Sequence, residues 1–195
     1  MAVRVFAFLW GFFEATVFFL VPDIWLTAVA LKEKRADVIY ALIWSLAGAL
    51  LGGSLVYAWA AHRPGEAFAW FQHLPGISER LVQDVRQGVV REGAMSMLKG
   101  IFRGIPYKLF AAAYGEQGEG VALFLFVSLI VRASRFAFSM AAAAGIRVLG
   151  SRFVRRWEMR RWIIHGLFWS VFCAVYFFYF GYIFPARGRV ACGVL

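Results

Sequence analysis

The sequence predicts an all-α integral membrane protein with two oppositely facing re-entrant helical hairpins and three transmembrane helices, arranged as an inverted repeat. Hydrophobic residues make up 62% of the 195 residues and charged residues only 16%, with a mean hydropathy of +0.69. A soluble domain is about half apolar and about a quarter charged. Two of the long apolar stretches are interrupted by a proline, and Lys and Arg cluster beside the ends of others. These observations predict that residues 1–195 form a single membrane domain.

The first long apolar stretch, residues 3–31, is interrupted by two acids and a proline. The interruptions are Glu14, Pro22 and Asp23. Because proline removes a backbone donor and breaks a regular helix, we expect the chain to reverse near Pro22. Residues 38–61 then form an uninterrupted span of membrane length, at 1.5 Å per residue. The spacing of Gly48 and Gly52 within this span predicts that another helix approaches it closely.

The second half of the chain repeats this order of a broken stretch followed by a span. Between the halves, residues 62–93 mix charged and large apolar residues, which predicts an amphipathic connection at the membrane interface. Residues 94–144 form the second repeat, the counterpart of the first repeat at residues 3–61, and its span begins at Val121. Its broken stretch is interrupted by Gly104 and Pro106. Glycine permits a tight reversal and proline ends a helix, so a second hairpin is expected there.

A basic turn at residues 147–161 and a final transmembrane helix at residues 162–184 complete the prediction. By the positive-inside rule, this basic turn and the cations between Lys32 and Arg35 should be cytoplasmic, which places the N-terminus in the cytoplasm. Since both spans cross once, each broken stretch must begin and end on one side and is therefore re-entrant. Interrupted segments in corresponding positions of inverted repeats point to a transport site near the membrane midplane.

Six ionisable residues lie within or beside the broken stretches and the second span. They are Glu14, Asp23, Arg103, Lys108, Arg132 and Arg135. A charge at the centre of a membrane helix costs about 2.5–3.5 kcal/mol on insertion scales, so an unpaired position in lipid is not expected. One interpretation is that the acids pair with the bases and hold the hairpins together. Alternatively, Glu14 and Asp23 take part in proton coupling while the cations bind an anionic ligand.

The four cations are predicted to bind the substrate, because four bases against two acids leave a formal excess of two positive charges. Arg132 and Arg135 are three residues apart and share one helix face. Arginine suits phosphate, since its planar group donates two hydrogen bonds at once. Arg103 and Lys108 flank Pro106, and we expect both to face one anionic headgroup. The alternative is that these two cations reach the interface without selectivity.

Three motifs resemble the DedA/VTT superfamily, also called the SNARE-associated Golgi protein family. FFEATVFFLVPDIWL at residues 12–26 resembles its acidic, proline-containing hairpin. RGIPYKLF at residues 103–110 and RASRF at residues 132–136 are similar to the second hairpin and following helix of its YqaA-like branch. The resemblance implies two opposed re-entrant hairpins in the bacterial inner membrane. It also implies translocation of a lipid-linked phosphate such as undecaprenyl phosphate, with proton coupling.

The leading functional hypothesis is therefore translocation of an anionic lipid or lipid phosphate. A proton-coupled exporter or antiporter of small cations and a non-transporting membrane scaffold are the alternatives. An enzyme is not expected, because no nucleophile, base or metal-ligand grouping is recognisable and Cys173 and Cys192 form no paired motif. No cofactor is predicted. The formal charge of +10 is attributed to anionic headgroups, which are the expected partners, and not to nucleic acid; homo-oligomerisation stays open.

Overall fold

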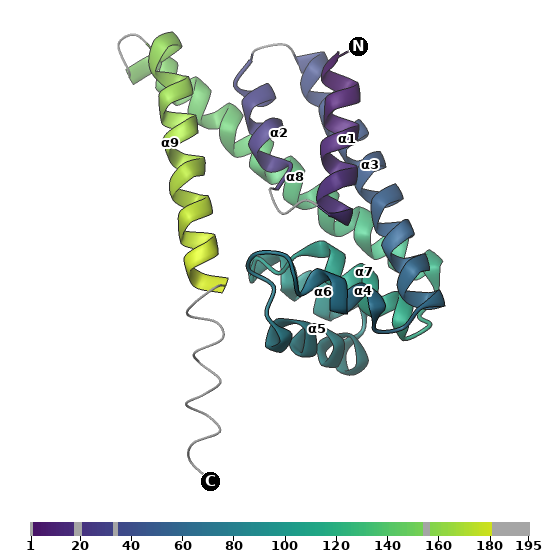
Figure 1. Cartoon of the computed structure of the whole chain (residues 1–195). Helices are drawn as coiled ribbons and strands as arrows, with labels where there is room; N and C mark the ends of the chain where they lie inside the picture. Colours follow the sequence, from purple (N-terminus) through teal and green to yellow (C-terminus); the bar gives the residue numbers. More distant parts are fainter. Residues whose placement is uncertain (1, 18–20, 33–34, 154–156, 181–195) are drawn as a thin grey trace.

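The computed structural model describes residues 2–17, 21–32, 35–153 and 157–180, and these residues form helices joined by short connections (Figure 1). The helices are α1 (Ala2–Thr16), α2 (Asp23–Ala30), α3 (Arg35–His62), α4 (Glu66–Phe71), α5 (Glu79–Glu92), α6 (Ala94–Phe102), α7 (Tyr107–Glu116), α8 (Val121–Phe153) and α9 (Trp157–Phe178). No strand occurs within the described residues. The predicted all-α class is confirmed.

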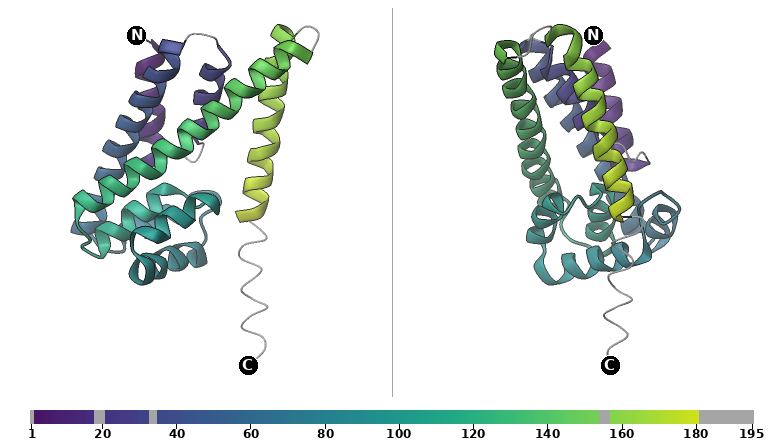
Figure 2. Two further views of the ribbon diagram at one scale, coloured as in Figure 1. Left: turned by 180° about the vertical axis from the view of Figure 1, so that it is seen from behind. Right: turned by 90° about the vertical axis from the view of Figure 1, so that its left-hand side faces the viewer.

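Three of the described helices are long and apolar enough to cross a membrane. The candidate spans are Ala36–His62 in α3, Val121–Arg152 in α8 and Arg160–Phe178 in α9. They correspond to the three spans predicted from the sequence. With 33 residues, α8 is about 50 Å long, well above the hydrocarbon thickness of about 30 Å. It crosses the molecule obliquely (Figure 2), and a tilt of this kind accommodates a helix longer than the bilayer core.

Close packing of α1 on α3 depends on glycine. A Cβ atom added at Gly48 or Gly52 of α3 would meet the backbone carbonyl oxygens of Phe8 and Phe12 in α1. Gly11 of α1 lies equally close to the backbone of α3. Only hydrogen in place of a side chain permits this backbone approach, so the close approach predicted from the Gly-x-x-x-Gly spacing is confirmed.

Both broken stretches contain the predicted helix breaks. Pro22 precedes the first residue of α2, and Pro106 precedes the first residue of α7. Proline is suited to the start of a helix because the backbone donor that it lacks has no partner there. Between α6 and α7, Gly104 adopts φ = +72°, a left-handed conformation that glycine adopts without strain.

The two halves of the chain share a pattern of helix contacts. The first helix of each broken stretch packs on the long helix that follows it, α1 on α3 and α6 on α8. The second helix of each packs on the long helix of the other half, α2 on α8 and α7 on α3. The long helices α3 and α8 run in opposite directions, and α4–α7 gather around the end of α3 and the start of α8 (Figures 1 and 2).

The connection at residues 62–93 is amphipathic, but its apolar side is covered by protein. In α5 the apolar residues Leu81, Val82, Val85 and Val89 are buried, and the helix packs against α6 and α7. Arg86 of α5 forms two hydrogen bonds to the carboxylate of Glu116 at the end of α7, at 2.5 and 2.7 Å. The apolar face of α5 therefore covers the second broken stretch, and the position of this connection at the membrane interface stays a prediction.

The basic turn expected at residues 147–161 is also largely helical. The helix α8 continues to Phe153 and α9 begins at Trp157, because arginine favours helix and a single glycine, Gly150, costs only about 1 kcal/mol. Residues 154–156 lie outside the described part of the chain, as do residues 181–184 of the final helix predicted at residues 162–184.

The α1–α3 contact makes a prediction about stability. Gly48→Ala should destabilise the protein by about 1–3 kcal/mol, because the added methyl group forces the two backbones apart. Gly145→Ala in α8 is the matched control, since a Cβ there has no neighbour within 4 Å and alanine favours helix. Thermal unfolding in detergent, followed by tryptophan fluorescence, measures both. Equal midpoints for the two variants would contradict the packing role of Gly48.

Candidate functional site

A buried ion pair joins the end of α1 to the middle of α8. Arg132 Nη2 donates to Glu14 Oε2, and the two side chains are only 4% and 6% exposed. Glu14 lies in the last turn of α1, where the negative end of the helix dipole disfavours a carboxylate. A cation from another element is therefore needed to keep this acid charged in a buried position.

Asp23 occupies the first residue of α2, where the helix dipole favours an acid. Its carboxylate accepts hydrogen bonds from Arg135 Nη2 at 2.8 Å and from Ser139 Oγ at 2.6 Å. Arg132, Arg135 and Ser139 are separated by three and four residues, so they lie on one face of α8. That single face of α8 therefore binds the acids on both sides of the first helix break.

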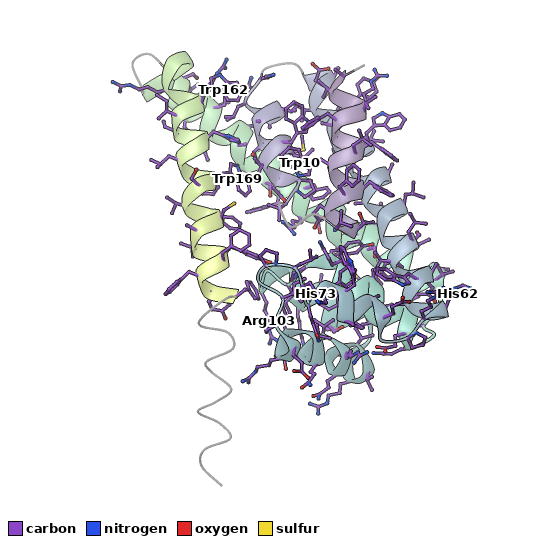
Figure 3. The ribbon with its side chains drawn as sticks, in the orientation of Figure 1. Trp10, His62, His73, Arg103, Trp162 and Trp169 are labelled. Carbon is purple, nitrogen blue, oxygen red and sulfur yellow. The ribbon has the colours of Figure 1, made fainter. Side chains whose placement is uncertain are left out.

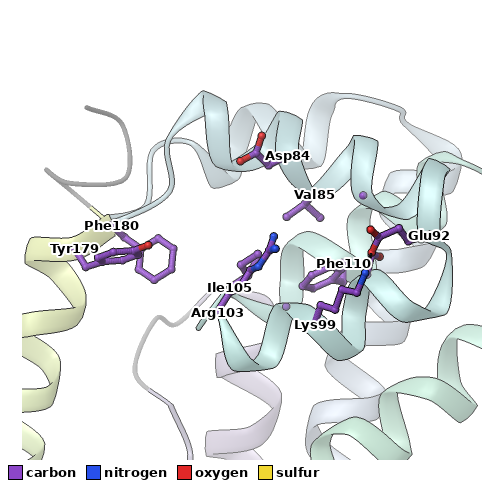
Figure 4. A pocket seen from close by; sticks show the side chains of 12 residues that line it. Asp84, Val85, Glu92, Lys99, Arg103, Ile105, Phe110, Tyr179 and Phe180 are labelled. Carbon is purple, nitrogen blue, oxygen red and sulfur yellow. Dashed lines mark hydrogen bonds and ion pairs between the residues drawn. The ribbon is translucent and has the colours of Figure 1, made fainter. Parts of the chain in front are cut away.

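The structure separates Arg103 from Lys108. Lys108 is buried on α7, 2% exposed, and lines a cavity of about 140 Å³ together with Glu14 and Arg135. Arg103 is exposed and lines a different cavity of about 560 Å³, near Asp84 of α5 (Figure 4). The expectation that both cations face one headgroup is wrong. The turn at Gly104 and Pro106 places Arg103 and Lys108 in the linings of different cavities.

Two neighbouring hollows meet at Arg135. The cavity shared by Glu14, Lys108 and Arg135, here called the polar cavity, also contains side chains of α9, including Tyr176. A second hollow of about 340 Å³, here called the apolar groove, lies between α2, α8 and α9. Its apolar lining includes Phe138, Ala142, Ala143, Ile146, Ile164, Phe168, Trp169 and Phe172. Arg135 and Phe172 line both hollows, so a cation stands at the junction of a polar and an apolar space.

The two arginines of the site differ in their surroundings. The guanidinium of Arg132 lies 4.3 Å from the ring centroid of Tyr107 and 5.1 Å from that of Phe136. It is enclosed by these rings and by its carboxylate partner, an arrangement that stabilises a buried cation. The side chain of Arg135 is 28% exposed. A ligand can therefore reach Arg135, whereas Arg132 holds the structure around the break.

The charges of the cluster leave a smaller excess than expected. Glu14, Asp23, Lys108, Arg132 and Arg135 comprise three cations and two acids, a formal excess of one. The prediction from the sequence was a formal excess of two positive charges, because it included Arg103. Among the described residues, no group of three or more His, Cys, Asp or Glu side chains could hold a metal ion.

Several polar contacts of the site were not identified from the sequence. Ser139 and Thr27 each lie four residues after a predicted site residue, Arg135 and Asp23, and this spacing was the available signal. Thr27 Oγ1 lies 2.9 Å from His165 Nε2 and accepts a hydrogen bond from Trp169 Nε1 at 3.0 Å. No sequence pattern indicates a contact between residues this far apart along the chain.

Comparison of the chain with protein-family models, with curated proteins and with solved structures found no match. The resemblance to the DedA/VTT superfamily stays a prediction that depends on the three motifs.

The buried pair makes a prediction about coupling. Glu14→Gln should lower stability by about 3–5 kcal/mol, because it leaves the Arg132 charge buried without a carboxylate. The double variant Glu14→Gln with Arg132→Gln should recover part of this loss, since no charge is left uncompensated. Thermal unfolding in detergent gives the coupling, with Glu79→Gln on the exposed side of α5 as the control. Losses that simply add in the double variant would show that the two side chains do not interact.

Proposed function

We propose that the protein translocates an anionic lipid, such as the lipid-linked phosphate undecaprenyl phosphate, across the bacterial inner membrane. The observation that carries this proposal is the position of Arg135 at the junction of the polar cavity and the apolar groove. A phosphate headgroup suits the polar cavity, where Arg135 and Lys108 supply positive charge. A hydrocarbon chain suits the groove, whose lining is mostly aliphatic and aromatic.

The broken stretches are proposed to be re-entrant hairpins of an inverted repeat, each returning to the side from which it starts. At 15 residues, α1 is the longest of their four helices, about 23 Å, which is short of the hydrocarbon thickness of about 30 Å. The shared pattern of helix contacts supports the repeat. Non-helical backbone is tolerated at membrane depth where it is buried in protein or lines a cavity, and the break residues Gly104, Ile105 and Pro106 line the polar cavity.

The ion pairs suggest how lipid binding and proton binding are coupled. Asp23 and a lipid phosphate compete for the same donor, Arg135. Protonation of Asp23 removes the negative charge that holds this arginine and frees it for the phosphate. Release of the proton restores the ion pair and expels the headgroup. Asp23 then alternates between a proton and Arg135, whereas Glu14 stays paired with the enclosed Arg132.

A cation exporter is less well supported by the same cluster. Glu14 and Asp23 are the acids that a cation pathway would use, but each already binds an arginine. The formal excess of one positive charge also disfavours cation entry. A scaffold without transport activity makes no use of the two hollows. The anionic lipid therefore fits the charges and the shape of the site best.

The proposed topology predicts the accessibility of engineered cysteines. In a background lacking Cys173 and Cys192, single cysteines at the exposed residues Arg4 and Lys32 should be labelled from the same side, the cytoplasm. A cysteine at Met95 in the second broken stretch should be labelled from the other side. An impermeant maleimide applied to intact and permeabilised cells measures this. Labelling of Arg4→Cys and Lys32→Cys from opposite sides would make the first broken stretch an ordinary span.

The proposed activity predicts the effect of substitutions in the polar cavity. Arg135→Gln should slow lipid-phosphate translocation by about tenfold or more, since a charge-assisted hydrogen bond is worth about 1.5–3 kcal/mol. Arg135→Lys should retain only part of the wild-type translocation rate, because lysine cannot donate two parallel hydrogen bonds to a phosphate. Fluorescent undecaprenyl phosphate in proteoliposomes, with an impermeant quencher outside, gives the rate. Arg103→Gln is the control, an exposed arginine outside the cavity. Equal rates for Arg135→Gln and Arg103→Gln would refute the proposed site.

A further inference from the structure

The helix α9 borders the apolar groove but is mostly exposed along its length. Its side chains Ile163 and Leu167 are 70% and 64% exposed, and no residue of its membrane-length part is buried. At its far end, Tyr176 lies against Gly104 in the second helix break. Phe180, which follows the last residue of the helix by two positions, also lies against Gly104. Near the start of α9, Arg161 donates to the carbonyl oxygen of Leu31 at 3.3 Å, and in its middle His165 and Trp169 contact Thr27 of α2. The groove lies between this part of the helix and α2 and α8.

The attachment to α2 centres on the hydroxyl group of Thr27. This hydroxyl donates its one proton to the carbonyl oxygen of Asp23 at 2.6 Å and accepts from Trp169 Nε1 at 3.0 Å. Trp169 lies on the side of α9 that faces α2 (Figure 3). The remaining lone pair of the hydroxyl faces His165 Nε2 at 2.9 Å and accepts a hydrogen bond in the tautomer that carries a proton on this nitrogen. Every hydrogen-bonding position of the hydroxyl is then used. Thr27, His165 and Trp169 are here called the Thr27 latch.

The latch joins α2 to α9 along one side of the apolar groove. Thr27, His165 and Trp169 all line the groove, and Thr27 lies one helical turn after Asp23, the partner of Arg135. Interhelical hydrogen bonds in membranes are individually modest, so a latch of this kind can open and close. The exposed part of α9 that carries the latch can move away from α2 while Phe180, buried in the core beside the second broken stretch, keeps the far end of the helix in place.

We propose that α9 is a lateral gate through which the hydrocarbon chain of the transported lipid enters the groove from the bilayer, and that the Thr27 latch holds this gate closed. The inference rests on the proposed function for the identity of the lipid. An apolar lining between α2 and the membrane-length helices α8 and α9, with the cation Arg135 where the groove meets the polar cavity, fits a chain that carries an anionic headgroup. Because α2 carries both Asp23 and Thr27 of the latch, exchange of the partner of Arg135 is linked to the width of the opening.

Distance measurements between spin labels test the latch without any transport assay. Labels at the exposed residues Ile43 of α3 and Leu167 of α9 report the position of α9 in phosphatidylcholine vesicles. Thr27→Val should shift the distribution to longer distances, whereas Thr27→Ser, which keeps the hydroxyl, should not. Thr16→Val is the matched control, since the Thr16 hydroxyl bonds only to its own helix, at Phe12 and Phe13. An unchanged distribution in Thr27→Val would overturn the latch.

Photocrosslinking tests the occupant of the groove. The probe is a phosphatidic acid with a diazirine on one acyl chain, in phosphatidylcholine vesicles. Crosslinks should concentrate on groove residues of α8 and α9, increase in Thr27→Val and disappear in Ala142→Trp, which fills the groove. Ala141→Trp, the neighbouring residue outside the groove lining, is the control and should retain them.

The outcomes separate the gate from the proposed function. Equal crosslinking in Ala142→Trp and wild type, or crosslinks spread evenly over all lipid-facing helices, would overturn the groove as a chain site. Groove-specific crosslinks without translocation of undecaprenyl phosphate would leave the gate standing and refute the proposed function. Translocation of undecaprenyl phosphate with no movement of α9 in Thr27→Val would support the proposed function and refute the gate.

Discussion

Neutralisation of buried charge is the constraint on which the structure depends. Two acids flank the first helix break, and both are almost fully buried. Desolvation makes such groups costly unless a cation and further hydrogen bonds compensate them. One face of α8 supplies both cations, Arg132 to Glu14 and Arg135 to Asp23. The position of the first broken stretch on α8 follows from these pairs, and so does the location of the polar cavity.

The two ion pairs, although similar in chemistry, are suited to different tasks. Arg132 is enclosed by aromatic rings and its carboxylate, so its displacement would leave a buried charge without compensation. Arg135 is partly exposed and lies where two hollows meet. A site that must bind and release an anion needs both kinds of contact. The fixed pair maintains the geometry, while the accessible one can exchange its partner.

The second broken stretch is stabilised by different means. Its helix α7 is buried between α3 and the amphipathic helix α5, which is attached through Arg86 and Glu116. Close contact with α3 again requires glycine: a Cβ atom at Gly115 would meet the backbone of Tyr57. Protein therefore surrounds α7 on several sides. Lys108 is held within that packing and reaches the polar cavity from it.

The sequence by itself determined the features that depend on local composition and spacing. These are the membrane class, the three long apolar helices, the breaks at Pro22 and Pro106, the close approach at Gly48, and the shared face of the α8 arginines. Tertiary structure alone decided the partners. It placed Arg103 apart from Lys108, covered the apolar side of α5 with α7, and brought Thr27 to His165 and Trp169. The physical reason is that a helix break or a periodic pattern acts over a few residues, whereas a contact between distant residues depends on every turn between them.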